Sequence, residues 1–212
     1  RLAPMLLAAV VPPVVVPKAP DRFVPAGFDR QEIGGYLAAR MQANLGKRLL
    51  QIEEAALLAG FQKRPGSHPW IGEHIGKYLD AAANTYEFTR DEALRLQMTR
   101  MAAELVKTQM EDGYLGTYTN DQRWTSWDVW VHKYDLIGLL ASYRITGDER
   151  SLNAAKRVGD LLERTFGDGG GKRDIIAAST HVGMAATSVL EPMVRLYAYT
   201  GEKRYLEFCN YI

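Results

Sequence analysis

Residues 143–152 read YRITGDERSL, and a second version of this stretch, YAYTGEKRYL, occupies residues 197–206. The two copies are 54 residues apart, and each places a glycine, Gly147 or Gly201, directly before an acidic residue. A glycine ends a helix well, and an acidic residue favours the first turn of the next one. A less complete copy covers residues 86–94. The repeat therefore predicts helical hairpins that follow one another along the chain.

Apolar residues also recur at helical spacing on both sides of the repeat, and clusters of Pro and Gly separate these runs. No alternating strand pattern is visible after residue 30, so the predicted fold class is all-α. The expected helices cover approximately residues 31–60 with Gly60 as the C-cap, 73–89, 91–109, 131–147, 151–166, 184–201, and a last one that has begun before Ile212.

Stacked αα-hairpins either continue as an open solenoid or close into an (α/α) toroid. From residue 31 the chain holds three hairpins and part of a fourth, and a toroid of six hairpins needs about twice this helical length. We therefore expect residues 31–212 to be the N-terminal half of an (α/α)6 catalytic barrel that is interrupted at Ile212. Such a half would expose apolar faces, which favours homo-oligomers.

The first 30 residues differ from the rest of the chain. Residues 5–16, MLLAAVVPPVVV, are apolar but too few to span a bilayer, which needs roughly 20 apolar residues. They suit a short extended N-terminal arm or the remnant of a secretory signal, and a Pro-rich linker follows them. If residues 1–16 are a signal remnant, the protein is secreted or periplasmic, and otherwise it is cytoplasmic.

Composition excludes several classes of protein. The chain has 212 residues, and its 26 basic and 25 acidic residues give a net charge of +1. This balance argues against a nucleic-acid partner. The single cysteine, Cys209, excludes an internal disulfide framework, and no cluster of metal ligands with local spacing is present. We therefore expect no metal site within this chain.

Aromatic, histidine and acidic residues gather where the expected helices begin. The groups are SHPWIGEHIGK at residues 67–77, DGYLGTY at 112–118, WTSWDVWVHKYD at 124–135, and a fourth that starts at His181. In a closed toroid the inner helices begin at one end, so the four groups would converge at one mouth. Aromatic rings stack on the C–H faces of sugars, while carboxylates and imidazoles bind the hydroxyls.

This pattern predicts a substrate-binding site for carbohydrate. The predicted substrate-binding residues are Glu73, Tyr114, Trp127, Asp128, Trp130, His132 and His181. The same residues also suit structural roles, as core aromatics, capping histidines and a first-turn acid. Taken alone, they support only a sugar-like pocket in a helical toroid.

One family shares these motifs in this order. The run QMEDGYLGTY at residues 109–118, followed by Trp127 and by His-Lys-Tyr at residues 132–134, resembles the catalytic core of glycoside hydrolase family 127. That family, GH127, is typified by β-L-arabinofuranosidases. Residues 70–82 and 181–201 fit the same pattern, and the resemblance extends over residues 28–212.

The resemblance implies an (α/α)6 barrel followed by β-sandwich domains, and retaining hydrolysis of arabinofuranosides from plant glycans. It implies a zinc-held cysteine thiolate as nucleophile and a glutamate as acid/base, both in the later part of the barrel. We therefore expect the catalytic residues beyond residue 212, zinc only where those cysteines are present, and an inactive fragment. Cys209 does not match them. The family's sugar-contacting histidines carry over to His132 and His181.

The chain departs from the family at two places. Residues 132–135 read HKYD instead of the usual His-Glu-Leu-Tyr, and residues 137–140 read IGLL instead of Cys-x-Gly-His-Leu. These differences predict a divergent subgroup of the family, and they leave open whether its glycoside substrate is the usual one. Two other hypotheses are a different toroid carbohydrate enzyme, such as a uronyl hydrolase, lyase or epimerase, and a non-catalytic αα-solenoid that binds protein or glycan.

Overall fold

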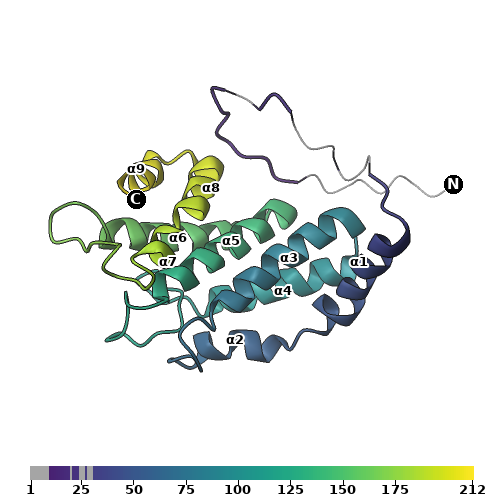
Figure 1. The fold of residues 1–212 in the computed structure, drawn as a ribbon, viewed down its shortest axis with the longest axis horizontal. Coiled ribbons are helices and arrows are strands. Elements are labelled where there is room, and N and C mark those ends of the chain that lie inside the picture. Colours follow the sequence, from purple (N-terminus) through teal and green to yellow (C-terminus); the bar gives the residue numbers. More distant parts are fainter. Residues whose placement is uncertain (1–9, 20, 24–26, 28–30) are drawn as a thin grey trace.

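The computed structural model describes residues 10–19, 21–23, 27 and 31–212, which form helices and, apart from an isolated bridge between Phe166 and Arg173, no β-structure (Figure 1). The predicted all-α class is therefore confirmed. The helices are α1 Gly35–Lys47, the 3-10 helix η2 Leu49–Gln51, α2 Glu54–Gln62, α3 Glu73–Thr89, α4 Glu92–Lys107, α5 Asp128–Thr146, α6 Glu149–Thr165, α7 Met184–Thr187, α8 Leu190–Thr200 and α9 Lys203–Tyr211.

The last three hairpins form two layers. In one layer α5 packs against α3 on one side and α8 on the other, and in the second layer α6 packs against α4 and α9. Each hairpin contributes one helix to each layer, so neighbouring helices within a layer run in the same direction (Figure 1). The N-terminal ends of α3, α5 and α7 therefore lie at one end of the molecule. This arrangement is part of an (α/α) toroid.

The sequence repeat is a repeat of helix ends. In each copy a residue in the left-handed conformation donates its N–H to the tyrosine carbonyl four residues earlier, at 2.8 Å. The N–H of the next residue, which is acidic, then donates to the hydroxyl of a threonine. The less complete first copy is confirmed, with an arginine where the others have glycine. The capping residues and their tyrosines are Arg90 with Tyr86, Gly147 with Tyr143, and Gly201 with Tyr197.

The expected single helix over residues 31–60 is wrong, because α1, η2 and α2 replace it. The carbonyl of Leu49 accepts a hydrogen bond from the Gln97 side chain at 3.1 Å, a tertiary contact that periodicity does not reveal. Gly60 is not a C-cap but lies inside α2, where a Cβ atom would lie 3.2 Å from the Cα atom of Gly66. The absence of a side chain at Gly60 therefore allows the loop that carries Gly66 to approach α2 closely.

The expected helix over residues 184–201 is also divided, into α7 and α8. Pro192 lies in the first turn of α8 and has no N–H to donate to the carbonyl of Ser188, which is the C-cap of α7. A proline at this position suits the start of a helix better than its interior. The break follows from that missing hydrogen bond.

The helices α3 and α5 approach each other through two glycines. A Cβ atom at Gly76 would lie 2.0 Å from the carbonyl oxygen of Tyr134, and one at Gly138 would lie 2.8 Å from the Cα atom of Gly76. Backbone therefore meets backbone along this crossing, which only glycine permits. The close packing brings the first turns of α3 and α5 together.

Residues 10–16 have no helical structure and cross the C-terminal ends of α5 and α8. Val11 N–H donates to the carbonyl of Arg144 at 2.8 Å, and Val14 N–H donates to that of Ala198 at 2.9 Å. Arg144 and Ala198 are equivalent positions of the repeat, so the segment makes the same contact with two hairpins. Much of the expected arm, including residues 1–9, lies outside the described residues.

None of the helices in the described part of the chain is long and apolar enough to cross a membrane. Several large apolar side chains are exposed around α7 and α8. Whether they lead to homo-oligomers stays a prediction. These residues are Ile176, Val182, Met184, Leu190 and Val194.

Candidate functional site

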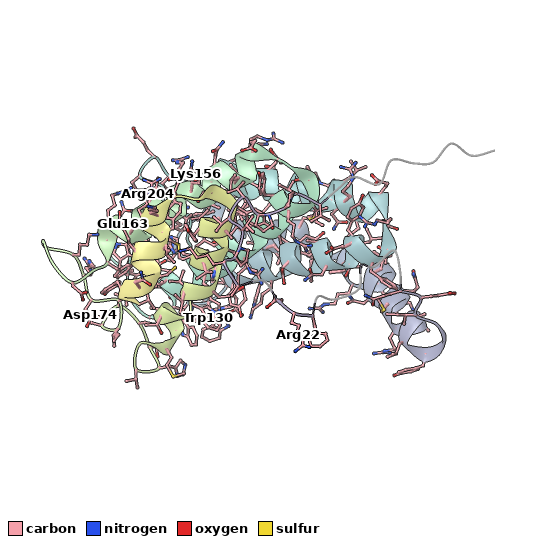
Figure 2. All side chains as sticks on the ribbon, turned by 90° about the horizontal axis from the view of Figure 1, so that it is seen from above. Arg22, Trp130, Lys156, Glu163, Asp174 and Arg204 are labelled. Atoms are coloured by element: carbon pink, nitrogen blue, oxygen red, sulfur yellow. The ribbon has the colours of Figure 1, made fainter. Side chains whose placement is uncertain are left out.

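The groups of aromatic and histidine residues meet at the N-terminal end of α3, α5 and α7. The Trp127 ring lies at their centre, with its centroid 5.9 Å from that of Trp70, 5.4 Å from Trp130 and 5.0 Å from His181. The His68 ring follows at 4.8 Å from Trp70. We call these five residues the aromatic cluster (Trp130 is labelled in Figure 2). The predicted convergence of distant segments at one end is confirmed.

Charged side chains border the aromatic cluster on α3 and α5. Glu73, in the first turn of α3, accepts hydrogen bonds from the Trp130 indole and from Lys77 Nζ, the latter at 2.6 Å. Lys77 Nζ also lies 4.5 Å from the centroid of the Tyr134 ring. Lys133 Nζ lies 4.3 Å from the Trp130 ring and 4.9 Å from the Tyr134 ring. The border is therefore a set of cation–π contacts with one buried carboxylate.

Hydrogen bonds fix the three loops that carry the cluster. The Tyr118 hydroxyl donates to the carbonyl of Pro69 at 2.8 Å and accepts from the N–H of Trp127 at 3.2 Å. The carbonyl of Ser126 accepts from the N–H of Thr180 at 3.3 Å. The site is thus held by contacts between segments that are far apart in sequence.

Backbone strain is concentrated in two of these loops. Trp124 and Ser126 have φ angles of 64° and 53°, and His181 and Val182 have φ angles of 54° and 55°. Residues with side chains rarely adopt this left-handed region, least of all a β-branched valine. Such strain persists where surrounding contacts impose it, and it is frequent at functional sites.

A buried polar layer lies beneath the cluster. Asp128 accepts hydrogen bonds from the Tyr114 hydroxyl and from the N–H of Trp124, both at 2.8 Å. His132 Nε2 accepts from the N–H of Leu115 at 3.4 Å, so Nδ1 carries the proton and donates to the carbonyl of Asp128 at 2.8 Å. Tyr114, Asp128 and His132 have no exposed surface.

Burial controls the protonation of this layer. Removal from water is the largest cause that raises the pKa of Asp128 and lowers the pKa of His132. The pKa of Tyr114 is raised by burial and by the neighbouring Asp128. All three shifts favour the uncharged forms. The layer therefore acts as a hydrogen-bonded support for the cluster.

The seven predicted substrate-binding residues occupy two levels. The outer level lies at the mouth, where Trp127, Trp130 and His181 are partly or fully exposed and Glu73 keeps 8% of its surface exposed. Members of the inner level are fully buried, and these are Tyr114, Asp128 and His132. A direct sugar contact from the inner level stays a prediction, because in this structure protein groups occupy its polar atoms.

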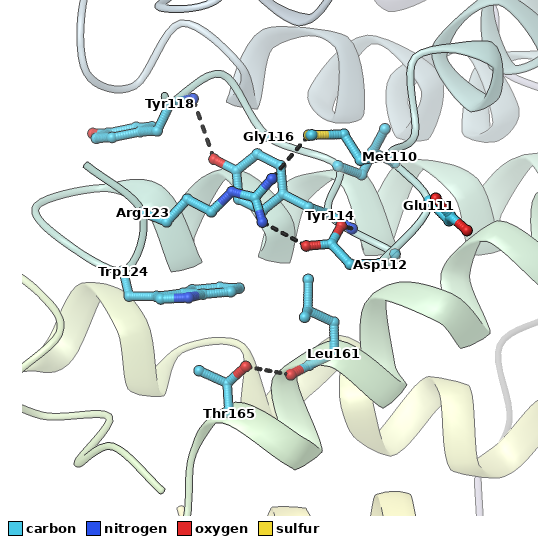
Figure 3. A network of polar contacts seen from close by, with 12 residues as sticks. Met110, Glu111, Asp112, Tyr114, Gly116, Tyr118, Arg123, Trp124, Leu161 and Thr165 are labelled. Atoms are coloured by element: carbon cyan, nitrogen blue, oxygen red, sulfur yellow. Dashed lines mark hydrogen bonds and ion pairs between the residues drawn. The ribbon is translucent and has the colours of Figure 1, made fainter. Parts of the chain in front are cut away.

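Two arginines that the sequence did not single out contact the Tyr114 ring, and Figure 3 shows one of them, Arg123. The Arg123 guanidinium lies 3.8 Å from the centroid of the Tyr114 ring and donates to Asp112 Oδ2 at 2.6 Å. Arg64 lies 5.7 Å from the same ring and donates to the carbonyl of Gly116 at 2.7 Å. Neither arginine belongs to a motif, so only the folded chain reveals these contacts.

The chemistry of the described residues does not fit a zinc site. Within the part of the chain that the structure describes, no group of three or more His, Cys, Asp or Glu side chains could hold a metal ion. Cys209 lies on α9, where burial raises the pKa of its thiol to about 11. Its Sγ atom contacts the carbonyl of Leu190 at 3.9 Å. The Cys209 thiol is therefore protonated near neutral pH and packs against the carbonyl of Leu190.

Asp135 on α5 has no exposed surface, and neither carboxyl oxygen has a hydrogen-bond partner among the described residues. Burial raises the pKa of Asp135 well above its usual value. Above pH of about 4 the unfolded chain releases this proton while the folded chain keeps it. The free energy of unfolding therefore falls by about 1.4 kcal/mol per pH unit until the folded pKa is reached.

We expect Asp135→Asn to unfold less readily than the wild type at pH 8, by more than about 1 kcal/mol. The difference should shrink as the pH falls to about 4, where the carboxyl is protonated in both states. Urea unfolding at several pH values measures it. A stability difference that does not change with pH would show that Asp135 is not a buried neutral acid.

Comparisons with known proteins agree on one family. The family model of the GH127 β-L-arabinofuranosidase catalytic domain matches residues 30–212 of this chain. The non-reducing end β-L-arabinofuranosidase of Bifidobacterium longum subsp. longum is 28% identical over 150 residues, which cover 65% of this chain and 22% of that protein.

Solved structures show the same fold. The structure of a GH127 β-arabinofuranosidase superposes with a TM-score of 0.71 and 19% sequence identity. The match covers 88% of this chain and 33% of the chain of that enzyme. A GH127 β-L-arabinofuranosidase from Geobacillus stearothermophilus T6 gives a TM-score of 0.62 and 22% identity, covering 83% and 29%. The chain therefore spans no more than 33% of the length of these relatives.

Proposed function

Residues 30–212 belong to the catalytic-domain family of the GH127 β-L-arabinofuranosidases, and on this premise we propose that the native protein hydrolyses L-arabinofuranosides. The observation that carries the proposal is the aromatic cluster, which gathers three tryptophans and two histidines beside Glu73 at one end of a toroid layer. Flat rings next to polar groups suit a sugar.

In this proposal the described residues bind and orient the substrate. Trp127 and Trp130 offer ring faces to the C–H surface of the furanose, and His181 and Glu73 offer polar atoms to its hydroxyls. The inner level holds the loops in position without meeting solvent. We place the nucleophile, the acid/base and any zinc on residues outside this chain, since the described residues do not fit a metal site.

Product analysis of the native protein tests the proposal. With an aryl β-L-arabinofuranoside and with arabinose-bearing oligosaccharides, we expect free L-arabinose released first in the β configuration. An unsaturated product or an epimer would favour a lyase or an epimerase of the same toroid type. Binding of the oligosaccharide without any turnover would favour a glycan-binding module.

A further inference from the structure

A cavity of about 380 Å³ lies between η2 and α3, beside the aromatic cluster. Leu49, Ile52 and Leu57 give it an apolar wall, and Lys77 and Arg48 line it with positive charge. Its volume falls in the range of about 300–1,000 Å³ that is typical of small-ligand sites. No carboxylate side chain of the described residues lines it.

His74 and Lys77 connect this cavity to the candidate site. Both line the cavity, and the His74 ring lies 5.7 Å from that of His68 in the aromatic cluster. Lys77 faces Tyr134 and binds Glu73, which in turn binds Trp130. A ligand in the cavity would therefore adjoin a sugar that is bound on the cluster.

Positively charged side chains outnumber negatively charged ones near the cavity and the aromatic cluster. Of the cations Arg48, Lys77 and Lys133, only Lys77 has a carboxylate of the described residues within 4.0 Å. The more distant Glu191 and Glu73 also attract Lys133, but their carboxylates already bind Arg195 and Lys77, each at 2.6 Å. Among the described residues that line the cavity, Arg48 is therefore the cation without a carboxylate partner, and it can attract an anion from outside.

We propose that the cavity is a subsite for a uronic-acid unit of the glycan, next to the arabinofuranosyl unit on the cluster. Arg48 would bind the carboxylate, and the C–H face of the ring would rest on the apolar wall of Leu49, Ile52 and Leu57. Lys77, which already binds Glu73, and Lys133, which does not line the cavity, add to the positive potential. This inference rests on the proposed function, because it assigns the neighbouring unit of the same substrate.

Calorimetric titration of the native protein with trigalacturonate and with its methyl ester tests the subsite. The ester keeps the shape and removes the charge, so we expect the acid to bind at least about tenfold more tightly. The preference should decrease in about 0.5 M NaCl. Equal binding of acid and ester by the wild type would overturn the proposal without any variant.

Substitutions then locate the binding. Arg48→Gln should weaken trigalacturonate about tenfold and leave the ester unchanged, because the Arg48 side chain makes no hydrogen bond or ion pair within the described chain. Lys47→Gln is the matched control, since Lys47 is the exposed neighbour that does not line the cavity, and we expect no change. Unchanged binding of the acid by Arg48→Gln would refute the assignment.

The proposed subsite and the proposed function can be tested independently of each other. Hydrolysis of a neutral aryl β-L-arabinofuranoside tests the function alone, and Arg48→Gln should keep the wild-type rate on it. If that hydrolysis occurs but the acid is not preferred, only the subsite is wrong. If no arabinofuranoside is hydrolysed while trigalacturonate binds through Arg48, the proposed function is wrong and the acidic-glycan site stands as a binding site.

Discussion

Replacing Gly76 with alanine is expected to lower the free energy of unfolding by about 3 kcal/mol or more, or to prevent folding. The new Cβ atom would lie 2.0 Å from the carbonyl oxygen of Tyr134, which belongs to the backbone of α5. A side chain could rotate away, but this carbonyl is fixed by its helix, so α3 and α5 would have to separate. Thermal unfolding and soluble yield measure the effect.

Gly46→Ala is the matched control for this change. Gly46 also lies in a helix, α1, but a Cβ atom there would have no neighbour within 4 Å. Helix propensity alone should then make the alanine variant as stable as the wild type, or more stable by up to about 1 kcal/mol. If Gly76→Ala behaved in the same way, the close contact of α3 with α5 would be wrong.

Asp128→Ala is expected to cost about 3 kcal/mol, the second largest effect. It removes the acceptor for the Tyr114 hydroxyl and for the N–H of Trp124, and both donors are left in the buried layer. Each buried donor without a partner costs about 1–3 kcal/mol. Urea unfolding followed by tryptophan fluorescence measures this loss, and Trp124 itself should report the loosening of its loop.

Asp121→Ala separates this effect from the simple loss of an acidic residue. Asp121 is exposed in the loop before α5, so its substitution should change the stability by less than about 0.5 kcal/mol. Asp128→Asn should fall between the two variants, because its amide oxygen still accepts one hydrogen bond. An Asp128→Ala variant as stable as Asp121→Ala would mean that the buried layer does not support the loops.

Local chemistry explains why much of the fold could be predicted. The Thr-Gly ends of α5 and α8 are set by a left-handed glycine and by hydrogen bonds within a few residues, so their sequence is sufficient to identify them. At the break, the carbonyl of Leu49 in η2 accepts a hydrogen bond from the Gln97 side chain, 48 positions further along the chain. Periodicity contains no information about such a contact.

The candidate site, like the fold, was predictable only where local sequence determines the structure. The positions of Trp127 and His181 follow from where helices begin, and parallel helices bring those starts together. The burial of His132 does not follow, because it depends on the path of the loop that places Trp124 against its ring at 5.5 Å. A helical pattern shows which face a residue occupies but not which loop covers it.

The activity of Trp127→Leu in the native protein tests the central claim most directly. Trp127 lies at the middle of the aromatic cluster, and leucine keeps apolar bulk while removing the ring that would stack on the sugar. We predict that kcat/KM for an aryl β-L-arabinofuranoside falls at least about tenfold, while Tyr36→Ala, at an exposed aromatic of α1, leaves it unchanged. A wild-type kcat/KM for Trp127→Leu would contradict the assignment of this cluster as the substrate site.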